Sequence, residues 1–287
     1  MAAVGRLNRL PHPLETTLST SAPITADSPV AIVTGGARGI GLAIGQWFLA
    51  RGHRIALLDI DNETLQRTVA AFDNPEAVLA VHADVRDQQQ VNAGVAQVVA
   101  RFGRVDKLVN NAGIAVFKPV MDTSYAEFRD VLNTNLDGAF LCTQACVPEM
   151  LKAGGGAIVN IASISGLRAS TLRVAYGTSK AALLHMTKQL AVELGNVGIR
   201  VNAICPGPVE TEMAKLVHSV AIRSDYQDAI PLGRYGTPEE MASTVGFLCS
   251  DDASFINGQF VAVDGGFDAA GVGLPTLRRN AAAAARP

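Results

Sequence analysis

The 287-residue sequence has little cysteine, little net charge and no long apolar run, and each shortage excludes a class of protein. Its four cysteines form no CxxC pair and no cluster with histidine, so they indicate neither a metal site nor a disulfide framework. The formal net charge of -2 gives no electrostatic basis for binding nucleic acid or an anionic membrane. No uninterrupted apolar segment is long enough to span a bilayer. We therefore expect buried free thiols, a reducing cytoplasmic location and a small-molecule partner.

Apolar residues make up 48% of the chain, which is enough for one large core, and they follow a repeating pattern. Short apolar runs alternate with helical patterns, and the runs fall at residues 30–33, 54–58, 78–81, 105–109, 156–161, 199–204 and 260–263. Alternation of this length predicts a parallel sheet with helices on both faces and right-handed crossovers. The sequence therefore predicts a single-domain, doubly wound α/β fold of the Rossmann type, with ligands at the carboxyl ends of the strands.

Both ends of the chain depart from this pattern. Residues 1–28 are rich in Ser, Thr, Pro and Ala and hold no apolar segment of signal-peptide length, while the last residues include an alanine run. We expect a flexible extension over 1–28, one folded domain over 29–268 and a tail over 269–287. Residues 207–236 follow a strand end and lose strict periodicity, which favours a substrate lid at the ligand edge.

A glycine-rich loop joins the first predicted strand to the first helix, with the sequence Thr34-Gly-Gly-Ala-Arg-Gly-Ile-Gly41. Glycines allow a tight turn and a close approach to a ligand, and the free N–H groups at the helix start favour a pyrophosphate. Asp59 ends the second strand, where a carboxylate can accept hydrogen bonds from an adenosine ribose. The alternative for Asp59 is a cap for the helix predicted over 62–72. Together the loop and the carboxylate predict a dinucleotide site.

Two residues of opposite charge bear on which dinucleotide binds. Arg38, inside the loop, is suited to the 2′-phosphate of NADP, whereas Asp59 would repel it. Two like charges about 4 Å apart cost on the order of 4 kcal/mol at an effective dielectric of 20. We therefore expect Asp59 to prevail and the cofactor to be NAD.

Tyr176 and Lys180 lie four residues apart in a helical pattern, so their side chains share one face of the helix. A neighbouring ammonium favours the phenolate, and we expect it to lower the pKa of Tyr176 from its usual value of about 10. Tyr176 would then exchange a proton with an alcohol or a carbonyl near neutrality. Taken alone, the pair is also compatible with an ordinary amphipathic tyrosine and a solvated lysine. Ser163, just past a strand end, falls at the same edge as the glycine loop.

In their order and spacing these motifs resemble the short-chain dehydrogenase/reductase family over about residues 29–267. The matching marks are Thr34-Gly35-x3-Gly39-Ile40-Gly41, Asp84-Val85, Asn110-Asn111-Ala112-Gly113, Asn135, Ser163, Tyr176-x3-Lys180, Pro206-Gly207 and Asp264-Gly265-Gly266. The resemblance implies a seven-stranded sheet, a homotetramer and a catalytic tetrad of Asn135, Ser163, Tyr176 and Lys180. Tyr176 would be the acid/base and Ser163 would bond the reacting oxygen. Asn135 would hold a water that relays protons through Lys180, which would also bind the nicotinamide ribose.

The resemblance also implies a cofactor-binding set. Asp59 stands where NAD-preferring members carry an acidic residue, and Asp84 and Val85 match an adenine-contacting pair. Asn111 would flank the adenosine side, and Val209 and Thr211 would hold the carboxamide and the pyrophosphate. The full predicted set is Gly35, Arg38, Gly39, Ile40, Gly41, Asp59, Asp84, Val85, Asn111, Ala112, Gly113, Tyr176, Lys180, Pro206, Gly207, Val209 and Thr211.

We therefore expect an oxidoreductase that transfers a hydride reversibly between NAD and a secondary alcohol such as a polyol, a sugar or another hydroxy compound. An NADPH-dependent ketone or 3-oxoacyl-thioester reductase is the alternative, which Arg38 keeps open and Asp59 disfavours. A non-catalytic dinucleotide sensor is a third interpretation, because a fold does not determine a function. Arg168, Arg173 and Arg223 are candidate anchors for an anionic substrate, although arginines on exposed loops are usually solvated.

Overall fold

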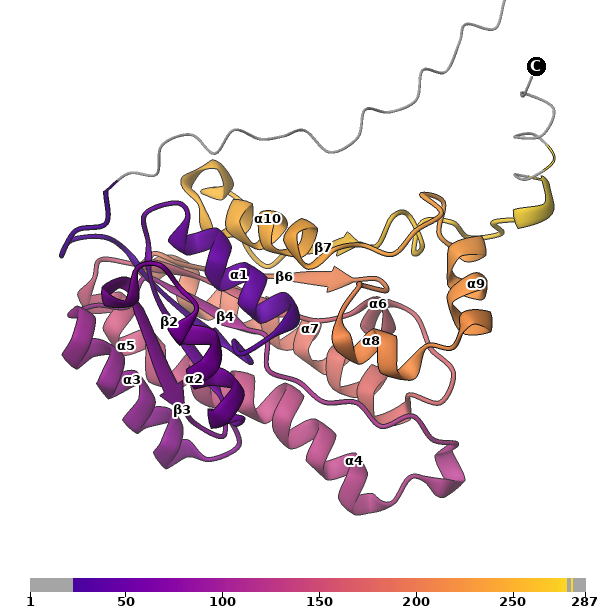
Figure 1. Ribbon diagram of the computed structural model, residues 1–287, viewed down its shortest axis with the longest axis horizontal. Helices are drawn as coiled ribbons and strands as arrows, with labels where there is room; N and C mark the ends of the chain where they lie inside the picture. Colours follow the sequence, from indigo (N-terminus) through magenta and orange to yellow (C-terminus); the bar gives the residue numbers. More distant parts are fainter. Residues whose placement is uncertain (1–22, 278–279, 281–287) are drawn as a thin grey trace, which may run out of the picture.

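The computed structural model describes residues 23–277 and residue 280, and its centre is a seven-stranded parallel sheet in the order β3-β2-β1-β4-β5-β6-β7 (Figure 1). The strands are β1 (Val30–Thr34), β2 (Arg54–Asp59), β3 (Val78–His82), β4 (Lys107–Asn110), β5 (Gly156–Ile161), β6 (Ile199–Pro206) and β7 (Phe260–Val263). Each apolar run of the sequence falls on a strand, with boundaries shifted by a few residues. The predicted doubly wound Rossmann fold is confirmed.

Helices cover both faces of the sheet (Figure 1). They are α1 (Gly39–Leu49), α2 (Asn62–Ala70), α3 (Gln88–Phe102), α4 (Tyr125–Leu132), α5 (Gly138–Lys152), α6 (Ile164–Leu167), α7 (Val174–Leu194), α8 (Glu212–Val217), α9 (Val220–Ala229) and α10 (Pro238–Cys249). Strand β1 shows why its sequence is apolar without alternation. Val30 and Ile32 pack into the core beside α3 and α5, while Ala31 and Val33 pack into the core beside α1 and α10. A strand buried on both faces has no position for a polar side chain.

The order of the strands places a crevice beside β1. From β1 the chain winds outward through β2 to β3, and then returns to β4, which pairs with β1 on its other side. The loops that leave β1 and β4 therefore run to opposite faces of the sheet. This divergence at the carboxyl ends is the point where open α/β sheets bind their ligands.

The long helix predicted over residues 124–153 contains a break in its hydrogen-bond pattern. Ser124 and Glu127 form a capping box at the start of α4, and a π-helical segment (Asn133–Asp137) joins α4 to α5. Within that segment Asn135 is buried, with 1% of its surface exposed. π-Helical turns are rare and occur often at functional sites, because they turn side chains away from the regular helical spacing.

The predicted lid contains two short helices. In Figure 1, α8 and α9, in orange, lie beyond the carboxyl end of β6. Thr211 and Ser219 cap the two helices through their side chains, and a parallel bridge between Val209 and Gly236 closes the base of the segment. The loss of periodicity in the sequence therefore corresponds to short helices joined by turns, and its movement as a lid stays a prediction.

The four cysteines are buried and free, as predicted. Burial raises the pKa of the Cys142 and Cys205 thiols to about 12, so neither is a reactive thiolate. Across residues 23–277, no helix combines the length and the hydropathy needed to cross a membrane. The same described part of the chain contains no group of three or more His, Cys, Asp or Glu side chains arranged to hold a metal ion. Most of the predicted extension over 1–28, and residues 278–279 and 281–287 of the predicted tail, lie outside the described residues.

Candidate active site

The glycine loop forms a backbone cradle that leaves no room for side chains at its critical positions. Gly35 and Gly39 have φ of 62° and 57°, which is the left-handed region that favours glycine. At Gly41 a Cβ atom would lie 2.1 Å from the carbonyl oxygen of Gly35. Asn111 Nδ2 fastens this loop to the end of β4 by donating to the carbonyl oxygens of Thr34, at 2.9 Å, and Gly35, at 3.0 Å. The loop is therefore held in one shape before any ligand binds.

The carboxylate of Asp59 lies at the end of β2, beside this loop. Its two oxygens accept the main-chain N–H groups of Ala37 and Asp61, each at 3.0 Å. The guanidinium of Arg38 is 62% exposed and pairs with the carboxylate of Asp61 at 2.7 Å. The sequence analysis considered the charges of Arg38 and Asp59 together. In the structure Arg38 instead forms its ion pair with Asp61, a residue that belongs to no motif. Hydrogen bonds from Thr64 are the main cause that holds the pKa of Asp61 below its usual value.

The predicted adenine-contacting pair has two different environments. Asp84 pairs with Arg86 at 2.7 Å, and this hydrogen-bonded pairing is the main cause that lowers the pKa of the carboxyl. The side chain of Val85 is buried in the core, where a Cβ atom at Gly138 would lie 2.7 Å from its Cγ2. Contact between this pair and an adenine stays a prediction.

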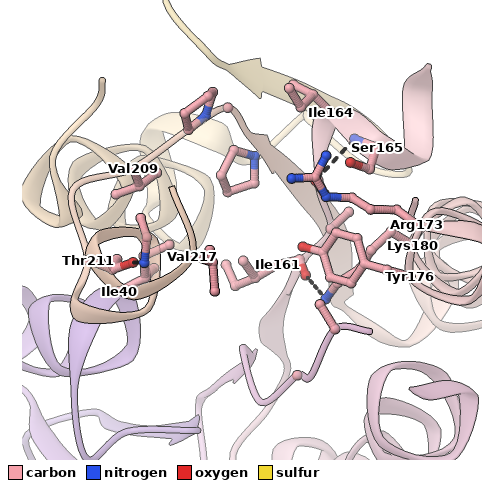
Figure 2. Close-up of a pocket in the computed structure, with 18 of the residues that line it drawn as sticks. Ile40, Ile161, Ile164, Ser165, Arg173, Tyr176, Lys180, Val209, Thr211 and Val217 are labelled. Carbon is pink, nitrogen blue, oxygen red and sulfur yellow. Dashed lines mark hydrogen bonds between the residues drawn. The ribbon is translucent and has the colours of Figure 1, made fainter. Parts of the chain in front are cut away.

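Tyr176, Lys180 and Ser163 lie together at the other side of the crevice. Figure 2 shows Tyr176 and Lys180 reaching into one pocket from α7, with Ile40, Val209 and Thr211 on the opposite side. Lys180 is buried, with 3% of its surface exposed, and its ammonium donates to the carbonyl oxygen of Ile161 at 2.7 Å. Burial lowers its pKa to about 8. Tyr176 and Lys180 therefore share one face of α7, as their four-residue spacing predicts.

The prediction that Lys180 lowers the pKa of the Tyr176 phenol is wrong. Burial raises the pKa of Tyr176 above its usual value, and this outweighs the lowering by the Ser163 side chain and by the positive charge of Arg173. The Lys180 nitrogen lies 5.8 Å from the centroid of the Tyr176 ring and is hydrogen-bonded to Ile161. Spacing along a helix predicts a shared face, but it does not predict how strongly the surroundings desolvate that face.

Asn135 lies behind this group and connects it to the loop after β4. Its Oδ1 accepts the N–H of Ile114 at 2.8 Å, while its Nδ2 donates to the carbonyl oxygen of Ile114 and to the Ser179 hydroxyl, both at 3.0 Å. A Cβ atom at Gly113 would lie 3.1 Å from Asn135 Oδ1 and 3.4 Å from Lys180 Nζ. Asn135, Gly113 and Lys180 are therefore close neighbours. The water that the resemblance assigns to Asn135 stays a prediction.

A cavity of about 230 Å³ brings a large part of the predicted set together. The predicted residues that line it are Ile40, Asn111, Gly113, Ser163, Tyr176, Lys180, Pro206, Gly207, Val209 and Thr211. The predicted residues outside its lining are Gly35, Arg38, Gly39, Gly41, Asp59, Asp84, Val85, Ala112 and Asn135. A Cβ atom at Gly39 would lie 3.7 Å from Thr211 Cγ2, so the glycine loop and the segment after β6 meet across the crevice.

Sequence reasoning missed several residues of this region. A second cavity of about 840 Å³ adjoins the first and shares Phe117, Ile164, Arg173, Val217, His218 and Tyr226 with it. The ring of His218 lies 3.1 Å from the hydroxyl of Tyr235 and packs against Tyr226 at 5.3 Å between centroids. Two sequence observations pointed to this region: the lack of periodicity over 207–236, and the candidate anchors Arg168 and Arg173, which both line the second cavity. The individual positions carried no motif.

Comparison with known proteins agrees with this geometry. Residues 35–268 match the family model described as Enoyl-(Acyl carrier protein) reductase. The chain is 44% identical over 248 residues to the 2-(R)-hydroxypropyl-CoM dehydrogenase of Xanthobacter autotrophicus, which covers 84% of this chain and 99% of that protein. The chain belongs to the short-chain dehydrogenase/reductase family. The resemblance inferred from the motifs is thereby confirmed.

Other members of the short-chain dehydrogenase/reductase family differ in what their names say they act on. The NAD-dependent glycerol dehydrogenase of Listeria innocua is 39% identical over 238 residues, which cover 83% of this chain and 93% of that protein. A solved structure of the 3-ketoacyl-(acyl-carrier-protein) reductase from Brucella melitensis, complexed with NADH, has a TM-score of 0.79 and 32% identity. It covers 85% of this chain and 100% of that chain. This chain is therefore an oxidoreductase of the family, with a nucleotide-binding Rossmann fold.

Proposed function

We propose that this chain is an NAD-dependent dehydrogenase that reversibly oxidises a secondary alcohol, with Tyr176 as the acid/base. One observation carries the proposal: Tyr176, Ser163 and Lys180 line the same cavity as Ile40, which is part of the glycine loop. A substrate in that cavity would lie between a proton-transfer group and the part of the crevice suited to a dinucleotide. That arrangement is what hydride transfer to or from a nicotinamide requires.

The crevice has the features that a dinucleotide needs. The glycine loop offers main-chain N–H groups at the start of α1, in a cradle that a Cβ atom at Gly41 would fill. Asp59 offers a carboxylate at the end of β2 for a ribose, with Asn111, Val209 and Thr211 along the remaining length. When bound, the nicotinamide ring supplies the group that accepts or donates the hydride.

The protein's own groups manage the proton. Because burial raises the pKa of Tyr176, the phenol is protonated at rest and suited to donate to a carbonyl oxygen. The nearby positive charge of Arg173 favours the phenolate that this donation leaves behind. Ser163 Oγ accepts the N–H of Ser165 at 3.1 Å, and the Ser163 side chain also hydrogen-bonds Tyr176, so a substrate oxygen bound by Tyr176 would lie beside the Ser163 hydroxyl. The reverse steps oxidise the alcohol.

The choice of NAD is supported by the environment of Arg38. Its guanidinium pairs with Asp61, which offsets its positive charge. The carboxylate of Asp59 accepts the N–H of Ala37 and therefore places a negative charge directly beside the glycine loop. A 2′-phosphate at this place would meet that negative charge. The glycerol dehydrogenase relative is named as NAD-dependent, and the Brucella reductase is described in complex with NADH.

The second candidate is an NADPH-dependent ketone or 3-oxoacyl-thioester reductase. It is favoured by the exposed position of Arg38, and by the 3-ketoacyl reductase among the structural relatives. The two candidates differ in cofactor and in direction. Initial rates with NAD and NADP, measured on polyols, sugars and hydroxy acids and on the matching ketones, separate them. A higher kcat/KM with NADPH than with NADH would replace our proposal with this second candidate.

The assignment of Tyr176 is tested by Tyr176→Phe. Because the phenol proton is removed while the ring remains, we expect kcat to fall by roughly 10³- to 10⁴-fold. The affinity for NADH, measured by fluorescence titration, should change by less than about threefold, since α7 and the glycine loop remain intact. A variant with near-normal kcat would refute the role of Tyr176.

We also propose that the protein is a cytoplasmic homotetramer. The buried free cysteines suit a reducing compartment, and several large apolar side chains, among them Val192 and Phe255, are exposed on the single chain. Sedimentation equilibrium of the purified protein tests the assembly. A mass equal to one chain of 30.0 kDa would contradict it.

A further inference from the structure

Three arginines near the second cavity differ in what holds them. Arg168 donates to the carbonyl oxygen of Phe267 at 2.9 Å and lies 4.0 Å from the carboxylate of Asp268. Arg223 pairs with the carboxylate of Glu210 and lies over the ring of Tyr235 at 4.4 Å. Both are therefore engaged in contacts between segments of the chain.

Arg173 lacks such partners. Within residues 23–277, its guanidinium forms no ion pair and no side-chain hydrogen bond, and its neighbour is the ring of Phe117 at 4.9 Å. The side chain is half-buried, so it is partly removed from the water that would otherwise solvate its charge. A guanidinium has five N–H donors and no acceptor, so a partly buried one without protein acceptors is suited to a ligand that supplies them.

The position of Arg173 relates it to the reacting group. It lines both cavities and directly precedes α7, three residues before Tyr176. Figure 2 shows its guanidinium extending into the pocket beside the Tyr176 ring. Arg173 and Tyr176 both line the first cavity, so one substrate in that cavity can contact both side chains.

The charge of the surrounding lining has the same sign. Among the described residues that line the two cavities, the charged ones are Arg168, Arg173 and Lys180, against the single carboxylate of Asp225 on α9. His218, which lines both, has its pKa lowered by burial and is neutral near pH 7. A neutral polyol would leave the positive charge of Arg173 uncompensated.

We propose that Arg173 is a substrate-binding residue that pairs with an oxyanion of the carboxylate class on a short secondary alcohol or its ketone. The inference rests on the proposed dehydrogenase function and deepens it by naming the substrate class. The planar guanidinium matches the two oxygens of a carboxylate, and Phe117 supports one face of that plane. Asp225 disfavours a second negative group elsewhere in the larger cavity, so the substrate carries a single anionic group.

The test compares 3-hydroxybutyrate with 3-hydroxybutanamide, which replaces the carboxylate by a neutral group of nearly the same shape. We expect wild-type kcat/KM to favour the carboxylate by about tenfold or more, since a hydrogen bond between two charged groups is stronger than one between a charged group and a neutral amide. Arg173→Gln should abolish that preference. The preference is a ratio between two substrates of one variant, so it is independent of the effect that Arg173 has on the pKa of Tyr176. Arg173→Lys, which keeps the charge but loses the planar fork, should restore part of the preference.

Arg168→Gln is the matched control. It removes a second arginine side chain from the lining of the larger cavity. Unlike Arg173, Arg168 already has partners in the protein, namely Phe267 and Asp268. We expect it to keep the wild-type preference for the carboxylate within about twofold. Equal turnover of acid and amide by the wild type would overturn the proposal. An unchanged preference in Arg173→Gln, or an equal loss in Arg168→Gln, would do the same.

Binding without turnover separates this inference from the proposed function. Calorimetry of acetoacetate and of 3-oxobutanamide with the enzyme saturated with NAD measures substrate recognition where no hydride is available. We expect tighter binding of acetoacetate in the wild type and in Arg168→Gln, and equal binding in Arg173→Gln. Turnover of neutral alcohols without this difference would leave the dehydrogenase standing and reject the role of Arg173. Selective acetoacetate binding without any hydride transfer would support Arg173 and reject the dehydrogenase.

Discussion

The two walls of the crevice are held by different kinds of interaction. The cofactor wall comprises residues 34–41, 59 and 111–114. We group with it Asn135 and Lys180, which lie across the crevice from the glycine loop but next to Gly113. The polar side chains of this wall bond mostly to main-chain atoms of other segments, as Asn111 does to Thr34 and Gly35. The substrate wall comprises residues 168–173 and 212–236. Its charged side chains are held mainly by other side chains, in pairs such as Lys215 with Glu212 and Arg234 with Glu240.

This difference explains how one family scaffold serves many substrates. A side chain that bonds the main chain fixes the shape of a loop, so its replacement disturbs the ligand site at once. Exposed ion pairs contribute little to stability, with a typical value of about 0–1 kcal/mol, so their members can be exchanged. The cofactor wall is therefore preformed and intolerant of change, while the substrate wall can vary with the substrate.

Glycine substitutions give the largest expected contrast between the walls. In Gly41→Ala the new Cβ atom would lie 2.1 Å from the carbonyl oxygen of Gly35 and 2.6 Å from Asn111 Nδ2. The loop has to shift, and we expect NADH affinity to fall by roughly a hundredfold. Gly233→Ala in the substrate wall meets no atom within 4 Å at a φ of 68°. It should lower the free energy of unfolding by about 1–2 kcal/mol and leave NADH affinity unchanged. Equal NADH affinities for the two variants would refute the contrast.

Lysines in the two walls should differ in how pH affects stability. The pKa of Lys180 falls from 10.5 to about 8 on folding, so above pH 8 the folded state releases a proton that the unfolded state keeps up to about pH 10.5. The unfavourable burial of charge, about 3 kcal/mol, applies fully below pH 8 and is relieved as pH rises. We therefore expect the free energy of unfolding of the wild type, relative to Lys180→Met, to rise by about 2–3 kcal/mol between pH 7 and 10.

Urea unfolding at several pH values measures this difference. The control is Lys215→Met, because Lys215 is exposed and Glu212 raises its pKa. The contribution of Lys215 is present below its unfolded pKa and is lost only as pH rises through the raised folded pKa, so its difference curve should be flat up to pH 10. A flat curve for Lys180→Met would show that burial does not depress the pKa of Lys180.

Asn135 tests the part of the cofactor wall that is formed by the loop after β4. In Asn135→Ala the N–H and carbonyl oxygen of Ile114 lose their partners, and we expect the free energy of unfolding to fall by about 2 kcal/mol. The comparison is Ser219→Ala, which removes the side-chain cap of α9 in the substrate wall. This change should lower the free energy of unfolding by about 1 kcal/mol. Only the first change should also weaken NADH binding. Equal losses of NADH affinity would contradict the division into two walls.

The smallest expected effect concerns cofactor choice. In Asp59→Asn one negative charge beside the loop is lost, and we expect the ratio of kcat/KM for NAD over NADP to fall by about tenfold. Glu212→Gln removes one negative charge from the substrate wall and should leave the ratio within about twofold. Steady-state kinetics with both cofactors at one substrate concentration give these ratios. An unchanged ratio in Asp59→Asn would show that Asp59 does not determine the preference for NAD over NADP. The neighbouring residues Arg38 and Asp61 would then be the next to test.

Local chemistry made much of the site predictable. The glycine positions, the shared face of Tyr176 and Lys180, and the apolar strands follow from sterics and periodicity, which act over a few residues and are visible in the sequence. The pKa of Tyr176 was not predictable, because desolvation depends on everything packed around the phenol. The partner of Arg38 was also missed. Asp61 follows the end of β2 with no motif, and the pair forms across 23 residues of chain.

The sequence by itself determined the strand and helix order, the sites where glycine is needed, and the candidates for proton transfer that the structure brings into one cavity, because each follows from short-range patterns. The tertiary structure decided which charges meet. It engaged Arg168 and Arg223 with other segments, left Arg173 facing the cavity, and surrounded Lys180 with the core. These outcomes depend on contacts between residues far apart in the chain, and on the water that such contacts exclude, neither of which a linear pattern encodes.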